Sequence, residues 1–135
     1  MEAALQLQER LQAASSEYQK LQSELSDVVE ARQKLDAQLS ENDLVKKEFA
    51  QLTPNNTVYK LIGPVLVPQD QAEAKSNVDK RLDFIRSDIK RMEAQLKDLG
   101  EKSEVKKLEI VEAQTKLQQM QEELQKSGAL QAVAA

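Results

Sequence analysis

The sequence contains no cysteine, no histidine and no tryptophan in 135 residues, and only two tyrosines and two phenylalanines. Without cysteine the chain can form no disulfide and has no thiol chemistry, and without histidine it lacks the commonest metal ligand and general base. So few aromatic side chains leave little material for a globular core. These absences fit a cytoplasmic protein and predict no bound metal or other cofactor.

Long apolar runs and a concentrated basic surface are missing as well. No stretch approaches the about 20 apolar residues that span a membrane, and the first ten residues have no secretory signal. The net charge is -4, whereas phosphate binding needs a basic surface. Basic pairs such as Lys80-Arg81 and Lys106-Lys107 are interleaved with acids, which is typical of a solvated helix face. We therefore expect neither a membrane nor nucleic acid as a partner.

The first part of the chain carries a heptad pattern, which predicts a helix over residues 4–52. Apolar residues recur in alternating steps of four and three from Leu7 to Phe49, as in the seam of a coiled coil. Arg32, Asn42 and Lys46 interrupt this stripe. The helix is expected to end before Pro54, because the residue before a proline is disfavoured in a helix.

A second heptad segment predicts a helix over residues 70–127. Asp70 and Glu73 form a capping-box pattern at its start. The same four-three steps then run from Val78 to Leu124 and weaken between Gly100 and Lys106. Ser127-Gly128 is a plausible stop, which leaves residues 128–135 as a flexible tail.

Between the two helices, residues 57–68 predict a β-hairpin that turns at Gly63-Pro64. Two strands alone are marginal in water, and an apolar edge invites strands from another chain. The alternative is a hairpin folded onto its own helix ends and covered by Leu44, Val45 and Phe49. We favour assembly with other chains, through Val58, Tyr59, Leu61, Ile62, Val65, Leu66 and Val67.

The two heptad segments match in length and phase, so the sequence predicts a mainly α fold: a long antiparallel two-helix coiled coil joined by a single β-hairpin. A turn near Gly63 pairs seam residues whose numbers sum to about 121, for example Leu25 with Leu96. The end of the second helix is then incompletely covered. An adaptable binding surface and a frayed terminus are both compatible with that end.

The block Val58-Tyr59-Lys60-Leu61-Ile62-Gly63-Pro64-Val65-Leu66-Val67, followed by residues 77–85 and 89–91, resembles the β-type subunits of prefoldin. The similarity covers nearly the whole chain, so residues 1–135 resemble a single prefoldin β-like domain. The resemblance implies a heterohexamer of α-type and β-type subunits. In it, the hairpins assemble into intersubunit β-barrels, and the coiled coils extend from this platform.

The resemblance also implies a function. Prefoldin is a cytoplasmic, ATP-independent co-chaperone that captures unfolded or nascent proteins, such as actin and tubulin, and delivers them to the cytosolic chaperonin. The uncovered helix end is then expected to contact unfolded clients. The client-binding residues on this interpretation are Leu5, Leu7, Leu117, Met120 and Leu124.

Two other classes of function compete with this one. An enzyme is not expected, because carboxylates such as Glu9, Asp43 and Asp88 lie on solvated helix faces and lack the burial and convergent geometry of a catalytic pair. A structural or tethering coiled coil, zipped between chains, remains the alternative. A tether has no need of the hairpin segment.

Overall fold

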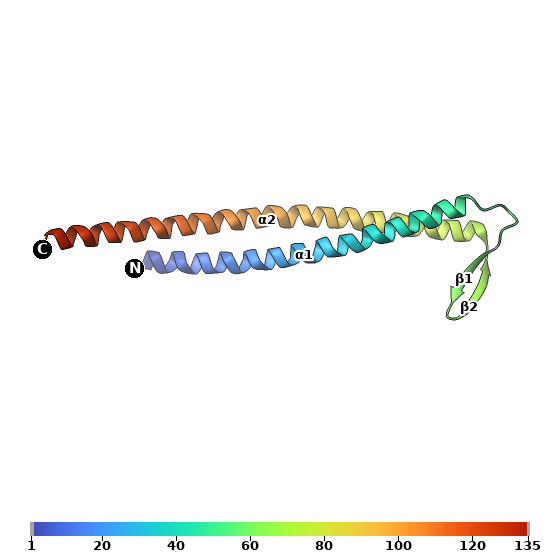
Figure 1. Cartoon of the computed structure of the whole chain (residues 1–135), viewed down its shortest axis with the longest axis horizontal. Coiled ribbons are helices and arrows are strands. Elements are labelled where there is room, and N and C mark those ends of the chain that lie inside the picture. The colour runs from blue at the N-terminus through green and yellow to red at the C-terminus, as the bar shows by residue number, and fades with distance from the viewer. Residues whose placement is uncertain (1, 135) are drawn as a thin grey trace. The chain divides into compact units, whose positions relative to one another are not determined.

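The computed structural model describes residues 2–134, with side chains described for residues 2–128. Along the chain, α1 (Glu2–Ala50) is followed by β1 (Val58–Ile62), β2 (Val65–Gln69) and α2 (Gln71–Ala134) (Figure 1). These elements form two compact units. The terminal unit comprises residues 1–27 and 96–135, and the hairpin unit comprises residues 28–95. The predicted mainly α fold with a single antiparallel hairpin is confirmed.

The predicted heptad stripes form the buried sides of both helices. In the hairpin unit, Leu82 is fully buried and Ile85 and Ile89 are buried beside it. In the terminal unit, Ala14 and Ala113 are buried. The other stripe residues are mostly half-buried, as expected where only two helices share a seam. Lys46 and Leu124 are the two stripe positions that the structure exposes.

The connection from α1 to the hairpin is held by side-chain amides. α1 ends at Ala50, four residues before Pro54. The Thr53 N–H then donates to Asn56 Oδ1 at 2.8 Å, which closes a local turn. From the start of α2, Gln71 Nε2 donates to the carbonyl oxygens of Thr53 and Asn56, at 2.8 and 2.6 Å. One side chain thus satisfies two loop carbonyls and ties the segment before the hairpin to the helix after it.

The start of α2 shows half of the predicted capping box. Asp70 Oδ2 accepts a hydrogen bond from the Glu73 N–H at 3.2 Å, and the Asp70 carbonyl accepts from Ala74 N–H at 2.9 Å. Among the described residues, no return bond from the Glu73 side chain accompanies it. The carboxylate of Asp70 therefore caps the helix alone.

The predicted helix end at Ser127-Gly128 is wrong, because α2 continues to Ala134. Among the described residues, Gly63 is the glycine with a positive φ, so Gly128 does not form the left-handed turn of a C-cap. Glycine inside a helix costs only about 1 kcal/mol, and the alanine, leucine and glutamine that follow are good helix formers. Ala135, the last residue of the predicted tail, lies outside the described residues.

The predicted pairing register is also wrong, by about one helical turn. In the terminal unit, Gln22 Nε2 donates to Ser103 Oγ at 2.7 Å and Lys106 Nζ lies 2.8 Å from Glu17 Oε2, so the paired residue numbers sum to 125 and 123. Both sums exceed the predicted 121. The excess is four residues for one pair and two for the other, on average nearly one turn of helix.

The residue numbers of ion pairs in the hairpin unit also sum to more than 121. Arg32 pairs with Glu93 at 2.8 Å and Lys46 pairs with Asp79 at 3.0 Å, and both pairs sum to 125. Arg86 lies 3.6 Å from Asp43, a sum of 129. Heptad seams repeat at every turn, so apolar spacing alone fits more than one register. The sequence pattern therefore predicted the seam but not its offset.

We expect the corrected register to be visible by disulfide trapping. It places Leu25 level with Leu99, both half-buried on the seam. Cysteines introduced by Leu25→Cys and Leu99→Cys should crosslink within one chain under mild oxidation, because bridged Cα atoms lie roughly 4.4 to 6.8 Å apart. The native chain has no cysteine to interfere. Non-reducing electrophoresis and intact mass report the bond.

The pair Leu25→Cys with Leu96→Cys serves as the control for that measurement. It should crosslink several-fold more slowly, because it requires the helices to slip by about one turn. Dimers linked between chains in place of internal crosslinks would contradict the antiparallel fold and support a tether.

Candidate functional site

The hairpin turns at a two-residue loop whose residue types fit its geometry. Ile62 pairs with Val65 across the loop, and Gly63 has φ 58°. Proline holds its own φ near -65°, so Gly63-Pro64 has the φ pattern of a type II′ turn. This turn matches the twist of antiparallel strands. It also fixes the register, in which Leu61 pairs with Leu66 and Tyr59 with Pro68.

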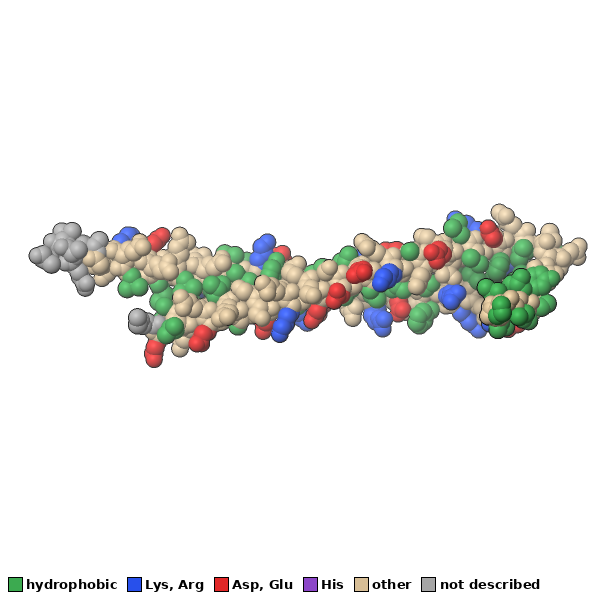
Figure 2. All heavy atoms as spheres, turned by 60° about the horizontal axis from the view of Figure 1, so that its bottom comes forward, with side chains coloured by type: hydrophobic (Ala, Val, Ile, Leu, Met, Phe, Trp, Pro, Cys, Tyr) green, Lys and Arg blue, Asp and Glu red, His purple; other side chains and the backbone are tan. Residues whose placement is uncertain are grey.

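Both faces of the hairpin are apolar and uncovered. Tyr59, Leu61 and Leu66 lie on one face, while Ile62 and Val65 lie on the other, and all five are more than half exposed. Figure 2 shows these hydrophobic side chains gathered over the hairpin. Of the seven predicted assembly residues, the remaining two are partly covered: Val67 is 39% exposed and Val58 is half-buried.

The chain's own helices do not cover this hairpin surface. Leu44 and Val45, which were the candidate covering residues with Phe49, are 63% and 39% exposed. Phe49 is half-buried. The alternative of a hairpin buried against its own α1 is therefore not observed in the hairpin unit.

The two outer edges of the hairpin differ in their backbone groups. The tight turn closes on a hydrogen-bonded pair at Ile62 and Val65, so alternate residues point their backbone groups outward. On β1 these residues are Tyr59 and Leu61, and on β2 they are Leu66 and Pro68. Proline has no N–H. The edge of β1 thus offers two N–H donors to a further strand, whereas that of β2 offers one.

Sequence reasoning missed one large exposed side chain in the hairpin unit. Phe84 lies on α2 and is 67% exposed. Its position two residues after the seam residue Leu82 places it off the buried stripe. An aromatic residue at a non-seam heptad position was the signal that could have identified it.

The predicted client-binding residues lie in the terminal unit, where they differ in exposure. Leu5 and Leu124 are 57% and 71% exposed, whereas Leu7, Leu117 and Met120 are half-buried. α2 extends past the start of α1 in this unit (Figure 1). The corrected register brings Leu7 level with Leu117, so α1 covers more of α2 than the sequence predicted.

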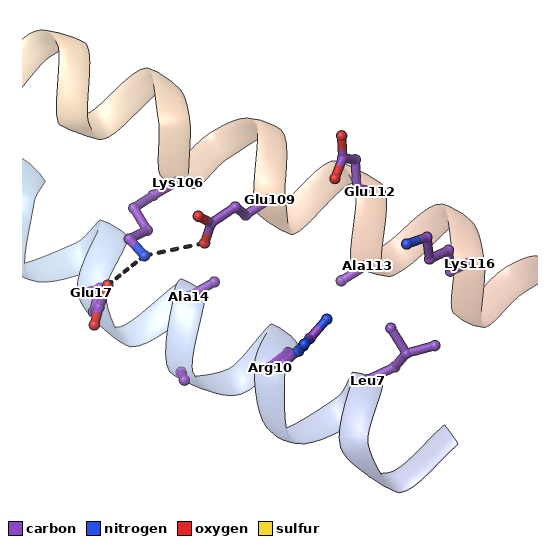
Figure 3. A pocket seen from close by; sticks show the side chains of 10 residues that line it. Leu7, Arg10, Ala14, Glu17, Lys106, Glu109, Glu112, Ala113 and Lys116 are labelled. Carbon is purple, nitrogen blue, oxygen red and sulfur yellow. Dashed lines mark hydrogen bonds and ion pairs between the residues drawn. The ribbon is translucent and has the colours of Figure 1, made fainter. Parts of the chain in front are cut away.

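Beside this helix end, a groove of about 400 Å³ separates the two helices of the terminal unit. Its floor includes the small residues Ala14 and Ala113, and charged side chains stand along it (Figure 3). Lys106 Nζ lies 2.8 Å from Glu17 and 3.1 Å from Glu109, which joins the helices at the rim. Sequence reasoning placed Lys106 on a solvated helix face and in the weakened part of the stripe, and did not predict its pairing with Glu17.

These contacts shift the ionisation of the two cross-helix partners. The hydrogen bond from Lys106, and then its positive charge, lower the pKa of Glu17. Hydrogen bonds to Glu17 and Glu109 raise the pKa of Lys106. Because the pKa of Glu17 is lowered on folding, its contribution is present above the ordinary carboxyl pKa and is lost as pH falls through the folded value. The contact is therefore complete at neutral pH.

The described residues contain no group of three or more acidic side chains placed to hold a metal ion. Within the same part of the chain, no helix is both long enough and apolar enough to cross a membrane. What the site offers is apolar surface: a two-faced hairpin in one unit and an incompletely covered helix end in the other.

Comparison with known proteins identifies the kind of chain that carries this arrangement. Residues 12–129 match the family model described as prefoldin subunit. The chain is 47% identical to prefoldin subunit 6 of Homo sapiens over 115 residues, covering 85% of this chain and 89% of that protein. It is 48% identical to prefoldin subunit 6 of Saccharomyces cerevisiae over 96 residues, covering 71% of this chain and 84% of that protein.

A solved structure shares the fold. The crystal structure of the prefoldin beta subunit from Thermococcus strain KS-1 superposes with a TM-score of 0.71 at 25% identity, covering 76% of this chain and 90% of that one. That protein is a prefoldin beta subunit. Its likeness to this chain agrees with the β-type fold that the single hairpin predicted. The family match, the curated relatives and the hairpin between two long helices agree, and the chain belongs to the prefoldin subunit family.

Proposed function

We propose that this chain is a β-type subunit of a heterohexameric, ATP-independent co-chaperone that captures unfolded or nascent proteins. Its partners are other α-type and β-type prefoldin subunits, which its hairpin joins in an intersubunit sheet. We further propose that the complex works in the cytoplasm and passes its clients, such as actin and tubulin, to the cytosolic chaperonin. Membership of the prefoldin family supports each of these steps.

The observation that carries the proposal is the uncovered hairpin. Its central residues Leu61 and Leu66 are 68% and 61% exposed on one face, and Ile62 and Val65 are exposed on the other. Burying apolar surface gains about 25 cal/mol per Å², and an isolated two-stranded hairpin is marginal in water. Strands from neighbouring subunits both bury this apolar surface and stabilise the hairpin, because they pair with its outer edges and close a barrel around one apolar face.

The helix end of the terminal unit supports the capture of clients. Leu5 and Leu124 are exposed, and the half-buried Leu7, Leu117 and Met120 lie on the same end of the unit. Unfolded proteins expose scattered apolar side chains, which such a surface can bury. Each contact is weak, so several subunits must act on one client together, and this multivalency permits both capture and release without a nucleotide.

A purely structural tether is the second candidate, and the hairpin argues against it. A tether would zip its stripes against another chain, whereas here the cross-helix bonds Gln22 to Ser103 and Arg32 to Glu93 join α1 and α2 of one chain. The exposed hairpin also has no role in a tether. The carboxylates Glu17 and Glu109, which lie close together in the terminal unit, both pair with Lys106 and so do not support an enzyme there.

Replacing Leu66 by Asp should abolish assembly. Docking the hairpin would then bury an unpaired carboxylate in an intersubunit sheet, which is prohibitively unfavourable. We expect less than about a tenth of this variant to enter the hexamer, while its helix content stays unchanged. Co-expression with the partner subunits followed by intact-complex mass measurement and circular dichroism tests this.

Leu108→Asp is the matched control for that experiment. Leu108 is 62% exposed on α2 of the terminal unit, against 61% for Leu66, so the two substitutions introduce the same charge at equal exposure. The control variant should assemble normally. A Leu66→Asp chain that enters a full-size hexamer of normal stability would show that the hairpin is not the assembly surface.

Removing the residues after Thr115 should leave assembly intact but weaken client protection. The shortened chain loses Leu117, Met120 and Leu124, and therefore most of the apolar helix end. With one of six coiled coils altered, we expect the concentration of complex needed for half-protection of a denatured client to rise roughly twofold. Light scattering during client dilution measures this, with hexamer mass as the check on assembly.

Point variants distinguish the effect of losing apolar side chains from the effect of shortening the helix. The double variant Leu5→Ser/Leu124→Ser should weaken protection in the same direction, whereas Leu108→Ser should not. Full protection by both the truncated chain and the double variant would place capture elsewhere and leave the helix end without this role.

A further inference from the structure

The two outer edges of the hairpin carry different sets of backbone groups. The outward positions are Tyr59 and Leu61 on β1, and Leu66 and Pro68 on β2. Both β1 positions present an N–H and a C=O to a further strand. On β2, Leu66 presents both groups, whereas Pro68 presents only a C=O. The edges therefore differ at one position, which lies at the end of the hairpin away from its turn.

Near the turn, the side chains do not distinguish the two edges. Leu61 and Leu66 are cross-strand partners, so they lie on the same face of the sheet. Their exposed fractions are similar, at 68% and 61%. A strand docked beside either leucine meets the same side chain and the same backbone groups. The difference between the edges is therefore confined to the next cross-strand pair, Tyr59 and Pro68.

A strand that paired along β2 past Pro68 would bury a carbonyl without a donor. In an antiparallel pair, the residue opposite an outward position exchanges two hydrogen bonds with it. Opposite Pro68, the added strand donates its N–H, but its own C=O meets the proline ring. An unsatisfied buried carbonyl is costly, and prolines in sheets lie where the missing N–H would face solvent. A neighbouring strand on this edge is therefore expected to leave the sheet before Pro68.

The β2 edge does not resume beyond Pro68. The next outward position in the alternation is Asp70, where α2 begins. The Asp70 carbonyl already accepts from the Ala74 N–H at 2.9 Å, and its carboxylate caps the Glu73 N–H. Asp70 is thus committed to the helix, and pairing on this edge is limited to the half of β2 next to the turn.

We infer that β1 is the principal pairing edge of the hairpin, where a strand of another prefoldin subunit pairs along both Tyr59 and Leu61. Pro68 limits the strand on the β2 edge to the half next to the turn. This assignment rests on the proposed function, because it concerns the edges of the same assembly surface. It makes the two neighbours of this subunit unequal, since the contact along β1 includes two complete residue pairs and that along β2 includes one.

The test removes the distinguishing donor from β1. Tyr59→Pro is compared with Tyr59→Ala, which loses the same side chain but keeps the N–H. The ladder within the hairpin is unaffected, because Tyr59 occupies a non-hydrogen-bonded position, and its partner Pro68 shows that the hairpin accommodates proline at this level. Full-length chain is titrated onto the partner subunits, and intact-complex mass measurement gives the concentration needed for half-assembly of the hexamer.

We expect Tyr59→Pro to raise this half-assembly concentration at least about fivefold above that of Tyr59→Ala, because the proline leaves a carbonyl of the partner strand unsatisfied. The exchange variant Tyr59→Pro/Pro68→Tyr keeps the composition and moves the missing donor from the β2 edge to the β1 edge. It should weaken assembly as much as Tyr59→Pro does. Circular dichroism checks that the helix content of every variant is unchanged.

Pro68→Ala is the matched change on the other edge, because it supplies the missing N–H there. It should leave the half-assembly concentration within about twofold of the native value, as for a substitution that meets no partner. The assignment is overturned if Tyr59→Pro assembles as well as Tyr59→Ala or if the exchange variant assembles like the native chain. A Pro68→Ala chain that assembles at a concentration at least about fivefold lower would overturn it too, because a strand would then run beside that position.

These outcomes are distinct from a failure of the proposed function. A Leu66→Asp chain that enters the hexamer normally would remove the hairpin as the assembly surface altogether. If Leu66→Asp is excluded from the hexamer while Tyr59→Pro behaves like Tyr59→Ala, the hairpin remains the assembly surface and only the assignment of its edges is wrong.

Discussion

This chain has more apolar surface than its own elements can bury, and the rest of the structure depends on that constraint. Two helices share one seam, so only one stripe of each is covered. Among the described residues, the buried hydrophobic side chains are three alanines with Leu82, Ile85 and Ile89. Within the hairpin unit, the described residues form no layer against either face of the hairpin. An uncovered two-stranded sheet is marginal in water, and strands from other chains are the cover that we propose for it.

Apolar and polar residues have different roles in the seam between α1 and α2. Its apolar residues supply the attraction between α1 and α2, but they repeat at every turn and so define the register weakly. The polar contacts Gln22 to Ser103 and Arg32 to Glu93 show which alignment the two helices adopt. The polar interruptions of the heptad pattern at Arg32 and Ser103 are thus positions where cross-helix hydrogen bonds form.

Periodicity and turn chemistry allowed the elements to be predicted, whereas tertiary offsets could not be. The stripes from Leu7 to Phe49 and from Val78 onward, together with Gly63-Pro64, were sufficient to predict both helices and the hairpin. The register was misjudged because it depends on where side chains such as Gln22 reach, which lie outside the stripe. The end of α2 was misjudged because Ser127-Gly128 resembles a stop signal, although one glycine costs too little to end a helix. The exposure of Phe84 was overlooked, although its position two residues after the seam residue Leu82 lies off the stripe.

The two apolar surfaces differ in the strength of binding that they can support, and this difference follows from their geometry. The hairpin offers backbone donors and acceptors along its edges as well as side chains on two faces, so a partner strand gains directional hydrogen bonds and apolar burial together. The helix end has no free backbone groups to offer within a continuous helix, and its apolar residues are few and partly covered. Contacts there are non-directional and tolerate many sequences. A permanent interface therefore fits the hairpin, and transient binding of varied unfolded chains fits the helix end.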